Sequence, residues 1–528
     1  MTSDRHPKRQ LLFTVVLLFA GLVYAWFVLT KLSLGTLVAI PSDDAFYYFK
    51  IARNIVAGQG CTFDGIVPTN GFHPLWMVLM LPVFSIFPSD LETPMRVVLA
   101  GSGLLGCATL VLLYRVIRRH IGGGMEFVAV AVCLLPPVSS ALINGLETGL
   151  LVFAITVLLW ASYRFDLHAP SPRPFRELSF GICLGLIALC RLDSVFVMIS
   201  AVCLTIVFGV LRQISVRRCI IRLMAISAGF GVVFSPYCIW NMVRFGHIMP
   251  VSGAMKSSFP ALRQSLTLSG DRLFGAVLLA FLWVLLVAAV LGDSERTGRW
   301  RRTLGSPLTL LVVACTLHFA HAFLFLTWGV YWWHFSIYGL AMAVGLAEAT
   351  GRWTSKYPRL RSAVIGTLIL VALIPAAVLK VHEYRVKGAQ HRAWLEGAEW
   401  AREHTPPNTV FAIADAGLFG YFSDRRVINL DGKANGYAYR NALYYDTVDD
   451  YLRDARVEYI AHIAARYVNG NCRVIIPRVN RKDVVLPVSE TQEVFRSRAF
   501  PIYQHRFRRV GEARFTVWRY AKESFGSS

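Results

Sequence analysis

Apolar segments long enough to cross a lipid bilayer recur along the chain from Leu11 to Lys380. A membrane-spanning helix needs about 20 consecutive apolar residues. Inside a bilayer every backbone polar group must be satisfied within the protein, so such runs leave few folds open. Of the 528 residues, 55% are hydrophobic and only 16% are charged. We therefore predict an α-helical polytopic membrane protein.

The basic charge of the chain indicates its orientation. A net charge of +22 could indicate a nucleic-acid partner, but Lys and Arg in membrane proteins gather in cytoplasmic loops. Arg5, Lys8 and Arg9 precede the first apolar run, which places the N-terminus in the cytoplasm. The other basic clusters fall between later apolar runs: 115–120, 164–176, 212–222, 296–302 and 352–361. The charge is therefore interpreted as a topology signal, with no nucleic-acid partner.

The number of spans depends on one short apolar run. Residues 74–87 form a run of only about 14 residues, which is short for a span. If this run is re-entrant or lies on the surface, every later basic loop falls inside. This gives about eleven spans and an external C-terminus, with twelve spans as the alternative. The spans are expected near 11–30, 95–114, 124–139, 148–163, 177–191, 194–211, 220–240, 272–292, 306–326, 334–350 and 361–380.

The composition changes to that of a soluble domain after Lys380. Residues 391–404 have helical periodicity, and Val410–Ala414 and Val427–Leu430 resemble buried strands. Similar elements follow at 457–464 and 473–477. We predict a transmembrane catalytic domain at 1–382, with a first external loop at 32–94, and an extracytoplasmic α/β domain at 383–528. Of the cysteines, only Cys61 and Cys472 fall in external segments, and whether they pair is left open.

Two adjacent carboxylates, Asp43 and Asp44, follow the first span directly. Ser42 or Asp43 could cap a helix that begins near Ala45. Alternatively, the pair could supply a general base or ligands for a divalent metal ion beside an anionic substrate. A capping role and a catalytic or metal-binding role are compatible with each other. The residues after the pair predict an interfacial helix whose apolar stripe contains Tyr48, Phe49, Ala52, Ile55 and Val56.

Further polar residues fall on the same predicted outer face. Glu147 lies where one span turns into the next, and Arg191 could pair with Asp193 across a tight turn. A loop with Arg244, His247 and Lys256 places positive charge outside, which suits an anion such as a lipid phosphate. The remaining outer-face residues are Asn70 and His73 in the first loop and the aromatic cluster 328–334, including Trp332, which could form an interfacial belt or stack on sugar rings.

Several of these residues lie in motifs that resemble the GT-C superfamily of membrane glycosyltransferases, particularly the aminoarabinose and arabinofuranosyl transferase branch. The motifs are Asp43-Asp44 after the first span, residues 58–65 and 69–76, Gly145-Leu146-Glu147-Thr148, Arg191-Leu192-Asp193 and the series from Pro236 to Lys256. The resemblance implies a sugar donor linked to polyprenyl phosphate. The acceptor would be a glycan, a lipid or a protein, at the outer face of the bacterial cytoplasmic membrane.

The resemblance also implies roles for individual residues. Asp43 or Asp44 would be the catalytic centre, and we favour Asp44 as the base because Ser42 and Asp43 are better placed to cap a helix. Glu147 matches a second acidic position. The donor phosphate would bind Arg191, Arg244 and Lys256, and the substrates would contact Asn70, His73, His247 and Trp332. Metal dependence differs between branches, so Asp43 and Asp44 are also possible ligands of a divalent cation.

Other functions are compatible with parts of the pattern. The chain contains no P-loop and no dinucleotide fingerprint, so no nucleotide cofactor is assigned. A lipid or solute transporter would use the Arg191–Asp193 pair as a relay, although no internal repeat is visible. Within enzymes, an oligosaccharyltransferase to protein is the alternative. Membrane lipids are partners in every case.

Overall fold

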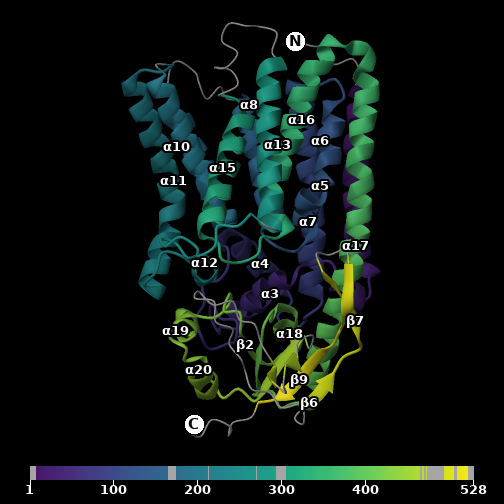
Figure 1. The fold of residues 1–528 in the computed structure, drawn as a ribbon, viewed down its shortest axis with the longest axis vertical. Helices are drawn as coiled ribbons and strands as arrows, with labels where there is room; N and C mark the ends of the chain where they lie inside the picture. Colours follow the sequence, from purple (N-terminus) through teal and green to yellow (C-terminus); the bar gives the residue numbers. More distant parts are fainter. Residues whose placement is uncertain are drawn as a thin grey trace.

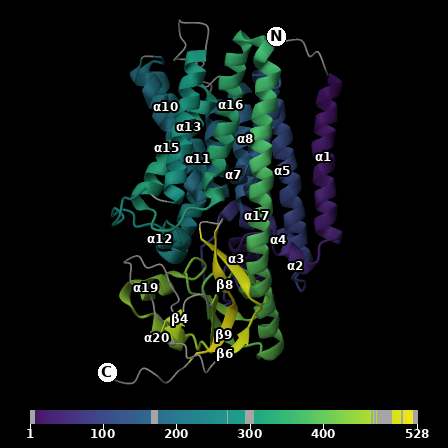
Figure 2. The same cartoon turned by 45° about the vertical axis from the view of Figure 1, so that its right-hand side comes forward.

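The computed structural model describes residues 7–164, 174–211, 213–268, 270–292, 305–463, 467–468, 471–472, 493–504 and 508–520. It is an elongated molecule with a bundle of long helices at one end and a mixed α/β region at the other (Figure 1). The first described helix begins at the far end of the bundle, and the last described strand lies in the α/β region. Figure 2 shows α1 (Pro7–Thr30) on the outer edge of the bundle, next to α5 (Thr93–His120).

The bundle consists of helices that cover every predicted span. Seven of the described helices are long and apolar enough to cross a membrane, or up to eight if α6 and α7, which are bent by 66° at a short break, count as one span. The chain is therefore a multi-pass membrane protein, while the count of eleven stays a prediction. The helices are α1 (Pro7–Thr30), α5 (Thr93–His120), α6 (Met125–Cys133), α7 (Pro136–Ile143), α8 (Thr148–Arg164), α9 (Pro174–Cys190), α10 (Val195–Val210), α11 (Val216–Phe245), α13 (Asp271–Gly292), α15 (Pro307–Phe325), α16 (Ser336–Lys356) and α17 (Arg361–His404).

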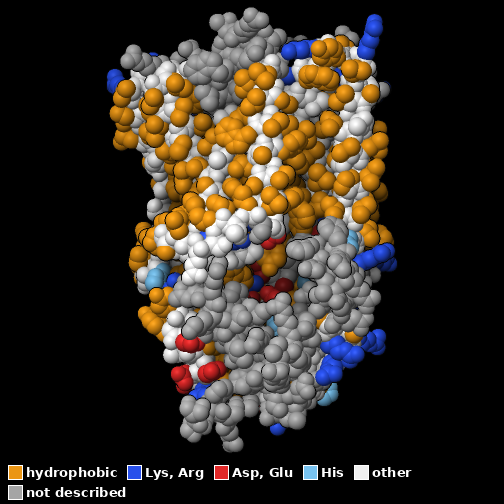
Figure 3. Space-filling view, viewed as in Figure 1, with side chains coloured by type: hydrophobic (Ala, Val, Ile, Leu, Met, Phe, Trp, Pro, Cys, Tyr) orange, Lys and Arg blue, Asp and Glu red, His pale blue; other side chains and the backbone are white. Residues whose placement is uncertain are grey.

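The surface of the bundle is apolar along its length. Orange side chains cover the bundle in Figure 3, and Lys and Arg side chains are visible at the end that carries the N-terminus. Leu11, Phe19 and Leu22 of α1 are among the exposed apolar residues. Such a surface is stable only against lipid or another protein. The predicted basic loop at 296–302 lies outside the described residues.

Short helices lie between the bundle and the α/β region: α2 (Leu34–Leu37), α3 (Asp43–Val56), α4 (Pro74–Ile86) and α12 (Val251–Lys256). The prediction that α3 presents one apolar side to the interface is wrong. Lys50 and Asn54, which do not belong to the predicted apolar stripe, are both buried. The reason is that α3 is covered on one side by α4 and on another by α18 (Gly417–Phe422) of the C-terminal region.

The C-terminal region contains a mixed sheet. Its order is β2-β1-β3-β9-β6, in which β1 pairs in parallel with β2 and β3, and β9 runs antiparallel to β3 and β6. The predicted strands near 410 and 427 are present. The strands are β1 (Val410–Ile413), β2 (Arg426–Asn429), β3 (Tyr459–Ile463), β4 (Tyr467–Val468), β5 (Asn471–Cys472), β6 (Glu493–Arg496), β7 (Phe500–Gln504), β8 (Arg508–Ala513) and β9 (Phe515–Arg519), with helices α19 (Tyr437–Tyr445) and α20 (Val448–Asp454).

Two parts of the sequence predictions for this region have no structural counterpart to compare. The predicted strand at 473–477 lies outside the described residues, and so does the side chain of Cys472. The predicted helix at 391–404 is the end of α17, which continues without a break from residue 361.

The first loop and the C-terminal region share one hydrophobic core. Phe46 and Phe49 of α3 pack against Tyr421 of α18, with ring centroids 6.0 and 5.8 Å apart. Polar contacts also join the first loop to the C-terminal region: Arg53 pairs with Asp424 at 2.7 Å, and Tyr421 donates to the Leu91 carbonyl. The C-terminal region is therefore packed firmly onto the end of the bundle.

Candidate active site

A cavity lies where α3, the ends of the bundle helices and the C-terminal region meet. Figure 3 shows acidic side chains in this hollow, below the apolar bundle. The cavity holds about 500 Å³ of atom-free space, including its open mouth. It is lined by Asp44, Tyr47, Tyr48, Gly71, His73, Leu146, Glu147, Arg191, Ser252, Lys256, Trp333, His334, Lys433 and Ala434. Five residues of the predicted site therefore line the same cavity.

Asp44 is the carboxylate of the adjacent pair that faces the cavity. Its Oδ1 accepts a hydrogen bond from the ammonium of Lys433 at 3.2 Å. Burial opposes ionisation, but the positive charges of Lys433 and Lys256 outweigh it and lower the pKa of Asp44 to about 2. Asp44 is therefore ionised at neutral pH.

Asp43 has different partners. Its two carboxylate oxygens accept hydrogen bonds from the backbone N–H groups of Gly417 at 3.1 Å and Leu418 at 2.8 Å. These are the first residues of α18, so Asp43 caps a helix of the C-terminal region and not its own helix. A Cβ on residue 417 would lie 2.1 Å from the Asp43 carbonyl oxygen, so only glycine permits this approach.

Lys433 enters the cavity from the turn after β2. Its ammonium lies 3.2 Å from Asp44, 3.1 Å from Asp431 and 3.5 Å from Asp415. Burial lowers the pKa of a lysine, but the surrounding carboxylates, Asp431 first, raise the pKa of Lys433 well above its usual value. The carbonyl of Lys433 would lie 2.1 Å from a Cβ at position 71, so Gly71 allows the first loop to pass beneath it.

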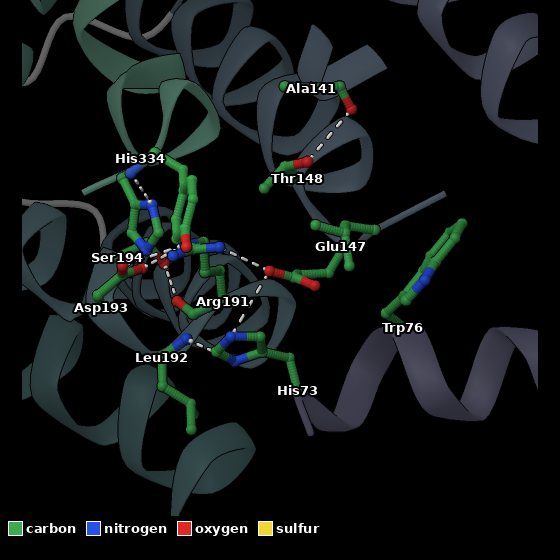
Figure 4. A network of polar contacts seen from close by, with 12 residues as sticks. His73, Trp76, Ala141, Glu147, Thr148, Arg191, Leu192, Asp193, Ser194 and His334 are labelled. Carbon is green, nitrogen blue, oxygen red and sulfur yellow. Dashed lines mark hydrogen bonds and ion pairs between the residues drawn. The ribbon is translucent and has the colours of Figure 1, made fainter. Parts of the chain in front are cut away.

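A second group of charged residues forms the opposite wall (Figure 4). Arg191, which follows α9, donates to Glu147 at 2.7 Å and through its Nε to both oxygens of Asp193 at 2.8 and 3.0 Å. The predicted Arg191–Asp193 pair is present. Because Arg191 binds the carboxylates of both Glu147 and Asp193, its positive charge is already offset within the protein before any ligand binds.

Glu147 presents its carboxylate to the cavity. Its Oε1 accepts from Arg191, and its Oε2 is buried, while the hydroxyl of Tyr48 interacts with the same carboxylate. His73 lies beside it: the Nδ1 of His73 accepts from the backbone N–H of Leu192 at 3.2 Å, so neutral His73 carries its proton on Nε2, 3.5 Å from Glu147. Burial lowers the pKa of His73, which favours this neutral form.

Lys256, at the end of α12, is the remaining predicted cation in the cavity wall. Burial lowers the pKa of Lys256, and the charge of Asp44 opposes that effect. No ion pair links Lys256 to a carboxylate in the described part of the chain. It is therefore available to an anionic ligand in a way that Arg191 and Lys433 are not.

Besides Asp43, four predicted site residues do not line the cavity. Asn70 is fully buried, where it donates to Asn241 at 2.9 Å and accepts from the Val251 N–H at 2.9 Å. Its amide connects the first loop to α11 and α12. The other three lie elsewhere: Arg244 is exposed at the end of α11, His247 stacks on Tyr437 with ring centroids 4.0 Å apart, and Trp332 packs against Phe274.

The suggested metal ligation by Asp43 and Asp44 finds no direct support. The two carboxylates have separate partners, the N-terminus of α18 and Lys433. Within the ranges that the structure describes, no group of three or more His, Cys, Asp or Glu side chains is placed to hold a metal ion.

Several cavity residues were missed by sequence reasoning, above all Lys433 and Tyr47. The hydroxyl of Tyr47 accepts from the Ala416 N–H at 2.8 Å and from Asn429 at 2.9 Å, which seats α3 against the sheet. One signal was present: Asp415 and Asp431 each follow a predicted strand. The carboxyl ends of parallel strands lie at one edge of a sheet, so the two turns should be neighbours.

Comparisons with known proteins agree with this architecture. A family model described as a domain of unknown function, DUF8728, matches residues 381–518, and no curated protein matches the chain. The fold is similar to that of ArnT from Cupriavidus metallidurans bound to undecaprenyl phosphate. That likeness has a TM-score of 0.57 and 12% identity, and it covers 98% of this chain and 99% of the other.

A second similar fold is archaeal. The oligosaccharyltransferase AglB from Archaeoglobus fulgidus, tethered to an acceptor peptide with an NVT sequon, matches with a TM-score of 0.52 and 15% identity. The match covers 86% of this chain and 69% of that chain. At these identities the likeness establishes the fold alone, and the fold is of the GT-C type.

Proposed function

We propose that this protein is a membrane glycosyltransferase that moves a sugar from a polyprenyl-phosphate donor to a hydroxyl-bearing or amide-bearing acceptor. The observation that carries the proposal is the cavity, where ionised Asp44, Lys256 and the carboxylate of Glu147 meet. The cavity lies at the junction of the apolar bundle and the α/β region. A donor with a lipid tail and a polar head reaches such a place from the membrane.

The charges suit the departure of a lipid phosphate. When the bond between the sugar C1 and the phosphate oxygen breaks, the leaving phosphate gains negative charge. A cation already in place stabilises that charge in the transition state. Lys256 has this role in the proposal, because Arg191 is engaged by Glu147 and Asp193. Arg191 then holds Glu147 in place and does not bind the phosphate itself.

The carboxylates suit activation of the acceptor. The acceptor oxygen forms the new bond to C1, and its proton passes to Asp44. Because the pKa of Asp44 is about 2, it takes the proton late, when the bonded oxygen has become acidic. The Glu147 carboxylate has lone pairs enough to accept a further hydrogen bond from a substrate hydroxyl or amide. One displacement of this kind inverts the anomeric centre.

The similar structures support the class of donor. The ArnT structure contains undecaprenyl phosphate, and an AglB structure with a TM-score of 0.50 contains dolichol phosphate and an inhibitory peptide. Both lipids are polyprenyl monophosphates. We place the chain in the bacterial cytoplasmic membrane, with the N-terminus inside and the α/β region outside, because basic residues occupy the last turns of α5 and α16, at Arg118, Arg119 and Lys356.

The test is direct transfer by the purified full-length protein. Polyprenyl monophosphates carrying different sugars are offered with lipid, glycan and peptide acceptors, and products are identified by mass spectrometry. We expect a covalent sugar–acceptor product that Glu147→Gln reduces. Transfer only from a pyrophosphate-linked oligosaccharide to the peptide would identify an oligosaccharyltransferase instead. Uptake into vesicles without any covalent product would contradict the proposal.

A further inference from the structure

The ammonium of Lys433 is surrounded by carboxylates and aromatic rings of the protein itself. Three carboxylates lie within 3.5 Å of its ammonium. The ring centroids of Tyr47 and Trp328 lie 5.5 and 5.3 Å from the same nitrogen. Its side chain is only 10% exposed. An ammonium has three N–H donors, and three carboxylates are present to accept them.

The backbone around Lys433 is fixed as well. Asp431 accepts from the backbone N–H groups of Asp415 and Lys433, both at 3.2 Å, so one carboxylate joins the turns after β1 and β2. Gly71 of the first loop packs against the Lys433 carbonyl. A lysine held in this way keeps its position while substrates come and go.

The dimensions of the cluster suit an ammonium ion. Carboxylate oxygens bind Mg²⁺ or Ca²⁺ at about 2.0–2.6 Å. The oxygens around Lys433 lie 3.1 to 3.5 Å from its nitrogen, which is within the range of ion pairs. In the described part of the chain no carboxylate cluster has the spacing of a metal site. The position between the three carboxylates is thus shaped for a nitrogen cation.

We propose that Lys433 is the built-in cation of the active site: a positioning residue through which the C-terminal region holds the Asp44 carboxylate toward the cavity. This inference rests on the proposed transferase function. Lys433 does not touch the reacting atoms. It offsets the charge of the carboxylates around it and fixes the direction of Asp44, so the membrane domain carries the base and the C-terminal region sets its position.

Chemical rescue tests this role. Lys433→Ala removes the ammonium and leaves a space between the three carboxylates. We expect its kcat to fall at least 100-fold with little change in KM for the donor, and methylammonium to restore kcat at least 10-fold. Tetramethylammonium, which has no N–H donor, should restore nothing. Lys387→Ala is the matched control, because Lys387 also joins the C-terminal part of the chain to the first loop, at the Ile40 carbonyl, but lies away from the cavity.

A thermal readout separates this inference from the proposed function. Methylammonium should raise the Tm of Lys433→Ala and leave that of the wild type unchanged, whether or not any transfer is detected. Lys433→Gln serves if the alanine variant does not fold, with the same loss of kcat expected. A wild-type kcat in Lys433→Gln would overturn the role of Lys433. The role would also be overturned if neither methylammonium nor tetramethylammonium changed the kcat or the Tm of Lys433→Ala.

Discussion

Asp43 and Asp44 are neighbours in the sequence with different surroundings in the structure. Successive residues on a helix point about 100° apart, so the two carboxylates at the start of α3 face different partners. Asp43 meets the N-terminus of α18, and Asp44 meets the cavity and Lys433. One carboxylate therefore stabilises the fold, and the other is available for chemistry.

The cap formed by Asp43 should be measurable as stability. Asp43→Ala removes the acceptor for the N–H groups of Gly417 and Leu418. Loss of a helix cap costs about 0.5–2 kcal/mol. We expect a lower unfolding free energy in detergent, measured by circular dichroism, while Asp43→Asn, which keeps an acceptor oxygen, loses less. Equal stability of Asp43→Ala and the wild type would contradict this assignment.

The lowered pKa of Asp44 predicts a pH dependence of stability. Its pKa is about 2 in the folded protein and 3.8 ordinarily, so the unfolded state binds a proton first as the pH falls. The contribution of Asp44 is therefore present above about pH 4 and is lost between about pH 4 and 2. As the pH falls over this range, the Tm of Asp44→Asn should decrease less steeply than the Tm of the wild type. Parallel declines would argue against the lowered pKa.

At the residue scale, sequence reasoning located part of the cavity. Asp44, His73, Glu147, Arg191 and Lys256 are all in its wall. These residues come from loops at the same end of the bundle, which the distribution of basic residues placed on one face. Sequence reasoning could not find Lys433, because it meets Asp44 across 389 positions of chain.

At the scale of elements, α3 connects the bundle to the sheet. The local periodicity predicts that α3 is a helix. It does not reveal that both sides of α3 are covered, because α18 comes from a distant part of the chain. For the same reason the sequence predicts a substrate contact for Asn70, whereas its amide binds Asn241 of α11 and the backbone N–H of Val251 in α12. Patterns within one segment do not reveal which other segment covers it.

Tyr47 provides a test of this connection. Tyr47→Phe removes the acceptor for the Ala416 N–H and the Asn429 amide, and both are buried. A buried donor left unsatisfied costs about 1–3 kcal/mol. We expect a lower Tm for Tyr47→Phe by differential scanning fluorimetry. Tyr444→Phe, at a tyrosine that is 51% exposed, is the control and should keep the wild-type value. The same Tm in both variants would show that the hydroxyl of Tyr47 contributes nothing.

At the scale of the whole molecule, the predicted boundary near residue 382 falls within a continuous helix. The long helix α17 runs from Arg361 to His404, from the bundle into the C-terminal region. The first loop and the sheet then share one core that contains Phe46, Phe49, Phe411 and Phe419. Apolar runs revealed the spans because their length is a local property, whereas this shared core depends on contacts between distant segments.

A truncation tests whether the bundle is stable without the C-terminal region. A chain that ends at His404 would expose Phe46, Tyr47 and Phe49, which are now buried. Burial of each such side chain contributes about 1.5–3 kcal/mol. We expect the truncated chain to aggregate on size-exclusion chromatography in detergent under conditions in which the full chain is monodisperse. A monodisperse truncated chain would contradict the shared core.

The measurement that tests the central claim most directly compares two neighbouring substitutions. The kcat for sugar transfer from a polyprenyl-phosphate donor is measured for Asp44→Asn and Asp43→Asn, with the fold of each checked by circular dichroism. The account predicts that Asp44→Asn lowers kcat by about 10²–10⁴-fold, the usual contribution of a general base. Asp43→Asn should stay within about tenfold of the wild type, because it keeps an acceptor for α18. Full activity of Asp44→Asn would contradict the account.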